Sequence, residues 1–339
     1  MPEPTSAWTR RLLAVIALVL VTMGLRATYS VTMPLAVACV IIAAVWPVKP
    51  WLDRVLPSKL SYAGTILVLL LVLGGFTASV YFSALQVMHA FSQNWDRFEA
   101  AYSSASDMMD GLDVQLGSKE GYQRLIGFGQ SILSNAYTIF VYLGFIALLV
   151  ILGLPEVPAL QRKLRDELHF RERREVVQAA GEISAKIRSY LGVTTLTSLI
   201  TGVACAVWSV VTGLELFLVW GLLNFLLNYI PVVGNLVGIV PPTLYAIIQY
   251  DGWTMPAVVF AGFLLIQLAV SNFVYPMLQG HSLSLSPIAI VVMLAFWSWV
   301  WGIAGALIAI PVTTTLVIVC EHFPATRWIA TLLSNPRRP

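Results

Sequence analysis

The sequence predicts an all-α polytopic integral membrane protein with about six to eight membrane segments and additional amphipathic helices outside the membrane. Only 11% of the 339 residues are charged and 58% are hydrophobic, whereas soluble domains carry about 25% charged residues. Apolar runs of membrane-spanning length recur along the chain. The stretch 191–320 contains just two formally charged residues, Glu215 and Asp251. Together these observations exclude an ordinary soluble domain.

Four apolar runs precede this charge-poor stretch, and a membrane-spanning helix needs about 20 such residues. The first follows Arg10 and Arg11, like the apolar part of a signal peptide, but no small-residue cleavage motif follows it. We therefore expect it to be retained as the first span of an N-terminal scaffold, residues 1–87, with a further span in 131–154. The four runs are 11–29, 31–47, 63–87 and 131–153.

The charges between the apolar runs alternate in sign. The segment 89–130 has six acidic and three basic residues, whereas 155–189 has eight basic and six acidic residues. The tail, 322–339, is basic. Because cytoplasmic loops carry an excess of Lys and Arg, we expect 88–130 outside, 155–189 and the tail in the cytoplasm, and both termini cytoplasmic.

Two extramembrane segments have helical apolar patterns. Apolar residues recur at spacings of three and four over 88–116, which is typical of a helix that packs on another helix. That helix could pack between protomers, or it could lie on its own protomer or on the membrane surface. The segment 171–191 also has one apolar and one charged face, which predicts an interfacial cytoplasmic helix.

The charge-poor unit, 190–321, divides at Gly, Pro and Asn residues into full-length and short pieces. The pieces 190–212 and 254–276 are long enough to span a membrane, whereas the arms between and after them have only about 14 to 17 residues. We read the short arms as two re-entrant helical hairpins, hairpin 1 (214–250) and hairpin 2 (288–320), in an inverted repeat. Full crossings by all arms would also keep both ends on one side, so the charge pattern leaves that alternative open.

The helix breakers at the hairpin centres are the candidate binding elements. Irregular backbone at membrane depth occurs only where protein or a water-filled cavity surrounds it, and such backbone binds ions and polar solutes in transporters. Asn224 and Asn228, spaced i,i+4, share one helix face. Glu215 and Asp251, at the feet of hairpin 1, are candidates for ion coupling. The candidate substrate- or ion-binding residues are Asn224, Asn228, Pro231, Gly234, Asn235, Gly238, Pro241, Gly302, Gly305 and Pro311.

The sequence lacks the signatures of other classes of protein. It has no nucleophile–base constellation, metal-ligand spacing or phosphate-binding loop, and its three cysteines are far apart. We therefore expect no enzyme, no metal, no cofactor and no nucleic-acid partner. No charged residue lies in the middle of an arm, although a proton-coupled carrier normally has carboxylates there.

The order of motifs resembles the autoinducer-2 exporter-like (AI-2E) family of bacterial permeases. The residues that carry the resemblance are ISAKIRSYLG, LLNFLLNYIPVVGNLVGIVPP, NFVYPMLQGHSLSLSP and WGIAGALIAIP. The resemblance implies a secondary transporter of the bacterial inner membrane, assembled as a homo-oligomer, with a pentamer expected. It also implies a moving hairpin unit and a small-molecule or ion substrate. Val232, Val233 and Asn235 stand where many relatives have aromatic residues or proline.

Three functions follow as hypotheses. The first is export of a small polar solute, such as the quorum-sensing signal autoinducer-2, through a hairpin-lined site. The second is sodium (or lithium)/proton antiport, and the third is a membrane scaffold without transport activity. The charge-free core favours the first, because it suits a neutral solute better than a proton.

Overall fold

The computed structural model describes residues 7–46, 58–93, 127, 136–167, 170–231, 233–279, 285–322 and 326–334. The regular elements in these ranges are helices, with an isolated bridge between Leu285 and Ser334. By length and composition, five helices could cross a membrane, and a sixth crossing results if α1 and α2 together form one span. The predicted all-α polytopic class is thus confirmed. The predicted heptad helix at 88–116 lies, beyond Gln93, outside the described residues.

The chain forms two compact units, and each contains one of the two predicted hairpins. Unit 1 combines Met1–Pro57, Tyr142–Arg188 and Leu283–Pro339. Unit 2 combines Ser58–Val141 and Ser189–Ser282. Hairpin 1 therefore belongs to unit 2 and hairpin 2 to unit 1.

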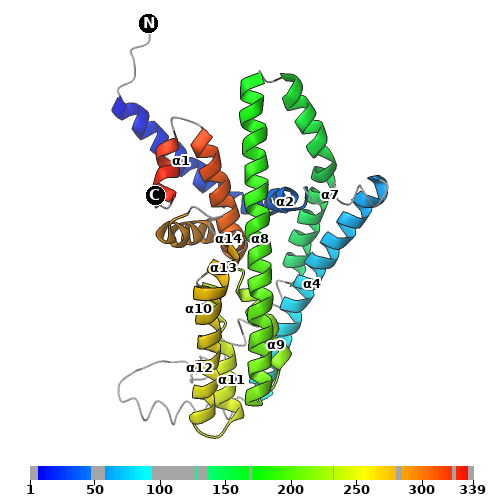
Figure 1. The fold of residues 1–339 in the computed structure, drawn as a ribbon, viewed down its shortest axis with the longest axis vertical. Helices are drawn as coiled ribbons and strands as arrows, with labels where there is room; N and C mark the ends of the chain where they lie inside the picture. Colours follow the sequence, from blue (N-terminus) through cyan, green and yellow to red (C-terminus); the bar gives the residue numbers. More distant parts are fainter. Residues whose placement is uncertain are drawn as a thin grey trace. The chain divides into compact units, whose positions relative to one another are not determined.

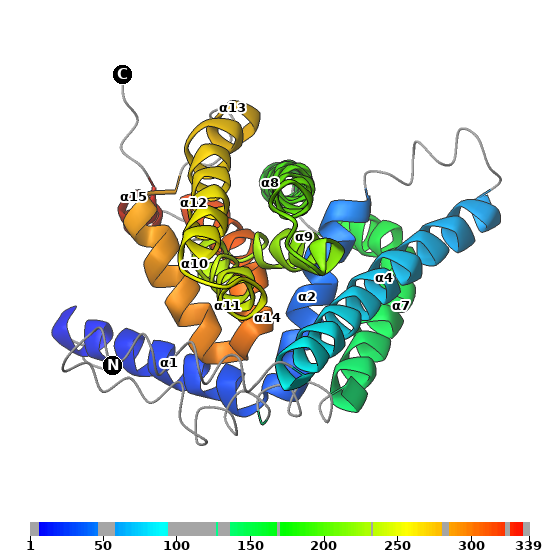
Figure 2. The same ribbon diagram turned by 90° about the horizontal axis from the view of Figure 1, so that it is seen from below.

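Unit 1 begins with two helices that meet at a sharp bend. The helices α1 (Ala7–Ala27) and α2 (Tyr29–Val45) form an angle of 95°, visible in blue in Figure 2. The Gly24 carbonyl accepts from both the hydroxyl of Thr28, at the bend (2.7 Å), and the Thr28 N–H (3.0 Å). By length and composition the two helices qualify together as one bent pair, either a broken span or a re-entrant loop, so the two separate spans at 11–29 and 31–47 stay a prediction.

Hairpin 2 is the helix α14 (Pro287–His322), which is broken where the sequence predicts it. Trp301 and Gly302 have non-helical backbone angles, and Gly302 has φ +62°, a left-handed conformation that glycine adopts without a steric penalty. A Cβ on Gly305 would overlap the carbonyl of Trp297 on the other arm. The indole Nε1 of Trp297 donates to Thr313 Oγ1 at 3.1 Å. The close approach and this bond hold the two arms together.

The bend between α1 and α2 contacts the tip of hairpin 2. Trp301 Nε1 donates to Thr32 Oγ1 at 3.1 Å, and the guanidinium of Arg26 lies 4.2 Å from the ring centroid of Trp299. Trp297 and Trp301 stack with their ring centroids 4.8 Å apart. We call the Trp301–Thr32 and Arg26–Trp299 contacts the latch. They fix the tip of hairpin 2 on the α1–α2 bend within unit 1.

The latch predicts that Trp301 and Thr32 are energetically coupled. In a double-mutant cycle with Trp301→Phe and Thr32→Val, the double variant should be about 1 kcal/mol less destabilised than the sum of the single variants, the usual worth of one hydrogen bond. Denaturant titration of the detergent-purified protein measures this coupling. Thr22→Val is the control, because the Thr22 hydroxyl bonds only within α1, to Val19. Additive effects of Trp301→Phe and Thr32→Val would contradict the latch.

The remaining elements of unit 1 surround hairpin 2. The short helix α15 (Arg327–Leu333) packs on α14, as does α2. The helix α7 (Ala136–Glu167) contacts α2 at Gly153, where a Cβ would lie 2.7 Å from Ile42. The helix α8 extends unbroken over Phe170–Thr212, so the predicted cytoplasmic helix and the following span form one helix. No proline interrupts this stretch, which explains its continuity.

Unit 2 contains hairpin 1 and the helices that pack on it. Residues 189–212 of α8 lead into α9, and α4 packs against α9. Glycines allow α8 and α9 to pack closely, because a Cβ on Gly202 would lie 2.8 Å from the carbonyl oxygen of Gly221. Figure 1 shows α11 and α12 adjacent, in yellow. The elements are α4 (Ser58–Gln93), α9 (Phe217–Leu227), α10 (Val233–Val237), α11 (Val240–Gln249), α12 (Thr254–Ala269), the π-helix η3 (Val270–Val274) and α13 (Tyr275–Gln279).

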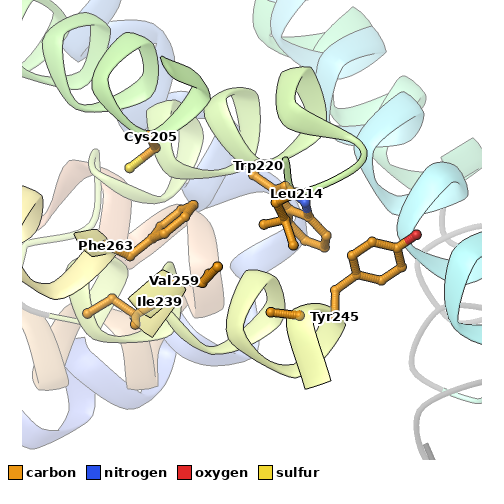
Figure 3. Close-up of a cluster of buried hydrophobic side chains, with 8 residues drawn as sticks. Cys205, Leu214, Trp220, Ile239, Tyr245, Val259 and Phe263 are labelled. Atoms are coloured by element: carbon orange, nitrogen blue, oxygen red, sulfur yellow. The ribbon is translucent and has the colours of Figure 1, made fainter. Parts of the chain in front are cut away.

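The core of unit 2 joins hairpin 1 to α8 and α12. Figure 3 shows Trp220 and Tyr245, from the two arms of the hairpin, on one side of the cluster and Phe263 of α12 beneath Cys205 of α8. Trp220, Phe263 and Cys205 are completely buried. The buried cluster is Cys205, Leu214, Trp220, Ile239, Tyr245, Ala246, Val259 and Phe263. This packing fixes the helices that carry the polar residues described next.

Candidate functional site

Asn224 lies at the centre of a buried amide cluster in unit 2. Its side chain is completely buried, and its Nδ2 donates to the carbonyls of Trp220 (2.9 Å) and Gly238 (3.1 Å). Its Oδ1 accepts from Gln267 Nε2 of α12 at 2.9 Å. Asn224 therefore ties the first arm of hairpin 1 to the second arm and to α12.

The bonding pattern fixes the orientation of both amides. A carbonyl can only accept, so the group that faces Trp220 and Gly238 must be the Asn224 NH₂. The Asn224 oxygen then faces Gln267, which must present its own NH₂. The Oε1 of Gln267 is left buried and without a donor in the described part of the chain. A buried acceptor without a partner costs about 1–3 kcal/mol, so Gln267 Oε1 is the unsatisfied group of the amide cluster.

The other predicted asparagines contact hydroxyl groups of neighbouring helices. Asn228 Nδ2 lies 3.0 Å from Ser198 Oγ and 3.5 Å from Thr197 Oγ1, both on α8. Asn235 Nδ2 donates to Ser271 Oγ of η3 at 2.7 Å, and its Oδ1 is buried without a partner in the described ranges. Asn224 and Asn235 thus face the α12–η3 side of hairpin 1, whereas Asn228 faces α8.

The glycines and prolines of hairpin 1 shape the turn. A Cβ on Gly234 would overlap the carbonyl oxygen of Leu227, and one on Gly238 would overlap Asn224 Oδ1. Pro241 lies in the first turn of α11, where a missing N–H costs no hydrogen bond. Pro231 is half-buried in the turn before α10. These residues allow the close approach of the two arms on which the amide cluster depends.

The foot of hairpin 1 is held by side-chain hydrogen bonds. Gln249 accepts from the Glu215 N–H (2.8 Å) and donates to the Gly213 carbonyl (2.7 Å). Tyr245 donates to Glu215 Oε2 at 2.8 Å. Tyr250, just beyond α11, donates to the Thr212 carbonyl at 2.8 Å. Burial and the negative charge of Glu215 raise the pKa of Tyr250 above its ordinary value, so the phenol keeps the proton that it donates.

The predicted coupling residues therefore differ in their surroundings. Glu215 bonds to the second arm of hairpin 1, whereas Asp251 is exposed and takes no part in the bonds at the foot. The candidates Gly302, Gly305 and Pro311 lie in unit 1, where they belong to hairpin 2. That the two hairpin tips meet around one substrate remains a prediction.

Our reading of the sequence missed a row of hydroxyl side chains on α8. Thr194, Thr197, Ser198 and Thr201 are all buried, and Ser198 and Thr197 contact Asn228. The signal was the sequence TTLTSLIT, in which hydroxyl residues recur three and four apart within an apolar span. Gln267 and Ser271, four residues apart on α12 and η3, were also absent from the candidates.

The buried polar residues have a common chemistry. Apart from tyrosine and tryptophan, every buried side chain with a polar group that the structure describes is a serine, threonine, asparagine or glutamine. Within the described ranges, no group of three or more His, Cys, Asp or Glu side chains is placed to hold a metal ion. A charged solute in this interior would lack a counter-charge, and an unpaired buried charge is costly.

Membrane-length helices, two broken helical hairpins and a neutral polar interior define the class: a multi-pass membrane transport protein. Comparison with known proteins gives the family. The family model described as "AI-2E family transporter" matches residues 15–325, and the chain belongs to that family.

The relatives are bacterial transport proteins. The AI-2 transport protein TqsA of Escherichia coli K12 is 32% identical over 206 residues, 60% of this chain and 57% of the relative. A putative transport protein of Haemophilus influenzae is 25% identical over 96% of both chains. The putative transport protein YhhT of E. coli K12 is 24% identical over 100% of this chain and 97% of the relative. The similarity supports a multi-pass transporter of the bacterial inner membrane.

Proposed function

We propose that this protein exports a small, uncharged, hydroxyl-rich solute of the autoinducer-2 type through the polar face of hairpin 1. The observation that carries the proposal is Gln267 Oε1, a buried acceptor of fixed orientation that has no donor among the described residues. A solute hydroxyl would supply that donor. Buried Asn235 Oδ1, which also lacks a partner in the described ranges, adds a second acceptor on the same side of the hairpin.

The neutral character of the interior favours this solute class. Binding a polyol requires donors and acceptors that replace water, and amides and hydroxyls provide both. The printed name of TqsA supports autoinducer-2 as the first substrate to test. The glycines and prolines of both hairpins would supply close backbone approach, as in transporters built from broken helices.

The assembly and orientation belong to the same proposal. We expect a homo-oligomer of five chains with both termini in the cytoplasm. The basic segments 155–189 and 322–339 support this orientation through the positive-inside bias. Native mass spectrometry of the purified protein measures the number of chains.

The direct test is flux of labelled autoinducer-2 in liposomes containing the purified protein. Asn235→Ala should lower the rate about tenfold, equivalent to about 1.4 kcal/mol for a lost polar contact, because Asn235 lies on the same side of the hairpin as Gln267. Asn272→Ala is the matched control and should leave the rate unchanged, because exposed Asn272 bonds only within its own helix, to Leu268.

Two outcomes would contradict the proposal. Equal flux in empty and protein-containing liposomes would exclude autoinducer-2 as the substrate. Wild-type flux in Asn235→Ala would remove the α12–η3 side of hairpin 1 from the site. A sodium-driven pH change that is lost in Asp251→Asn would instead favour the antiport alternative.

A further inference from the structure

The latch of unit 1 carries a positive charge for which its own helices supply no counter-charge. Arg26 lies in the last turn of α1, and its guanidinium stacks on the ring of Trp299. The helices α1 and α2 contain no acidic residue, and α14 has only Glu321, in its last turn. Among the described residues, neither a carboxylate nor a hydrogen-bond acceptor contacts the Arg26 guanidinium. The charge therefore lacks a partner within the described part of unit 1.

The stacked geometry leaves the donors of Arg26 available. A guanidinium stays protonated in proteins and has five N–H donors, all of which lie in its plane. The Trp299 ring interacts with the face of the group, so the edge with its N–H groups can still receive an anion. Arg26 is exposed, which means that this edge is accessible from the surroundings. Such a planar set of donors matches the oxygens of a phosphate group.

The surface around Arg26 has the composition of a membrane boundary. Trp299 is 49% exposed and Tyr29 is 50% exposed, and the ring of Tyr29 contacts that of Tyr142 on α7. Trp and Tyr are enriched at the level of the lipid headgroups, because one end of each ring system is apolar and the other is polar. The nearby apolar residues Val31 and Ile303 are also exposed. This surface thus offers a cation, aromatic rings and apolar side chains together.

The predicted topology places Arg26 where a lone cation needs a specific partner. With a cytoplasmic N-terminus and separate spans at 11–29 and 31–47, the bend between α1 and α2 lies at the outer face of the membrane. Arg10 and Arg11 then lie at the cytoplasmic end of the first span, where basic residues are normally found. Arg26 lies at the opposite end, where the phosphates of the outer leaflet are the nearest abundant anions.

We propose that Arg26, stacked on Trp299, binds the phosphate of an anionic phospholipid, and that the exposed side chains of Val31 and Ile303 contact its acyl chains. The phosphate oxygens accept hydrogen bonds from the guanidinium, and one negative charge balances Arg26. Because Arg26 contacts Trp299 near the tip of hairpin 2, the bound lipid reinforces the latch. The site belongs to unit 1, and the proposal does not depend on the nature of the transported solute.

Native mass spectrometry of the delipidated, full-length protein tests the site by titration with phosphatidylglycerol or phosphatidylcholine. Wild type should retain phosphatidylglycerol at lower lipid concentration than phosphatidylcholine, which carries no net charge. Arg26→Gln should weaken phosphatidylglycerol retention about tenfold, since it removes a charge-assisted contact. Arg26→Lys should lie between the two, because it keeps the charge but not the planar set of donors. Phosphatidylglycerol should also raise the unfolding temperature of wild type more than that of Arg26→Gln.

Arg162→Gln is the matched control. Arg162 is also an exposed arginine of unit 1, but its Nε donates to the carbonyl of Pro158 on its own helix. Retention of phosphatidylglycerol should be unchanged in this variant, and gel filtration establishes that each variant is folded. Trp299→Leu should weaken retention, because it removes the ring that holds the guanidinium in place.

Four outcomes would overturn the proposal. Wild type could retain both lipids equally, or Arg26→Gln could retain phosphatidylglycerol as wild type does. Displacement of the lipid by inorganic phosphate would show that a free anion is sufficient. A smaller oligomer in Arg26→Gln with unchanged lipid retention would assign the partner of Arg26 to a second copy of the chain. Autoinducer-2 flux, measured separately, tests the solute site and not this one.

Discussion

Replacement of Gly234 by alanine is expected to lower the free energy of unfolding by about 3 kcal/mol, the upper part of the range for overpacking. Gly234 is buried at the start of α10, and a Cβ there would overlap the backbone carbonyl oxygen of Leu227. A flexible side chain could move aside, but a backbone carbonyl cannot move without distorting α9. The amide cluster depends on this close approach, so solute flux should fall as well.

Gly192→Ala is the control for this experiment. Gly192 lies inside α8, is exposed and has open space where the added methyl group would lie. In a helix interior, alanine is about 0.5–1 kcal/mol more favourable than glycine, so this variant should be equally or more stable than wild type. Thermal unfolding followed by fluorescence-detected gel filtration compares the two. Equal stability of Gly234→Ala and Gly192→Ala would show that hairpin 1 does not make the close turn described above.

Replacement of Asn224 by aspartate is the second change with a large expected effect. The two residues have the same shape, but aspartate would present an oxygen to the carbonyls of Trp220 and Gly238, where Asn224 presents NH₂. The Gly238 carbonyl loses its side-chain partner, at about 1–3 kcal/mol, and the new oxygen also faces the Trp220 carbonyl, which keeps its helical bond. We expect a loss of about 3 kcal/mol or more of unfolding free energy, together with loss of flux.

The same substitution at Asn272 is the matched control, since that side chain is exposed. A double-mutant cycle then separates local from cooperative effects. The single variants Asn224→Leu and Gln267→Met each leave the other amide without its partner. The double variant should therefore lose about 1–2 kcal/mol less unfolding free energy than the sum of the losses in the two single variants. Additive costs would show that the two amides do not act as one cluster.

The breaks in the charge-poor half could be predicted from local backbone chemistry. Gly302 has the left-handed backbone that only glycine adopts freely, and the helix breaks at Trp301 and Gly302 as predicted. Hairpin 1 likewise ends its first helix at Leu227, before Pro231, and begins its last helix with Pro241 in the first turn. Such breaks depend on residues close in sequence, so one sequence is enough to locate them.

The pairing of polar side chains could not be predicted in the same way. Asn224 was a candidate because of its spacing from Asn228, yet the structure shows them facing different partners, Gln267 and Ser198. Those partners lie 43 and 30 residues away, and an apolar helix gives no sign of which neighbour it will contact. The hydroxyl row of α8 was overlooked because threonine is common in membrane helices, where its hydroxyl bonds to its own backbone.

The bend between α1 and α2 was missed for a related reason. The sequence there shows only Arg26 and a few polar residues between two apolar runs. A short polar interruption fits a loop between two spans as well as a sharp bend. Contacts made elsewhere, such as Trp301 with Thr32 and Arg26 with Trp299, stabilise the bend. They involve residues about 270 positions away in the sequence.

The hydrogen bonds at the foot of hairpin 1 decide where the hairpin can change shape. Glu215, Gln249 and Tyr250 connect both arms to each other and to the end of α8. The arms cannot separate there unless several hydrogen bonds, two of them half-buried, break together. The foot of hairpin 1 and the end of α8 therefore form one hydrogen-bonded base, and we expect any bending of the hairpin to take place in the short segments around α10. A movement that separates α10 from the first arm would have to break the bond between Asn224 and Gly238, beside Gln267.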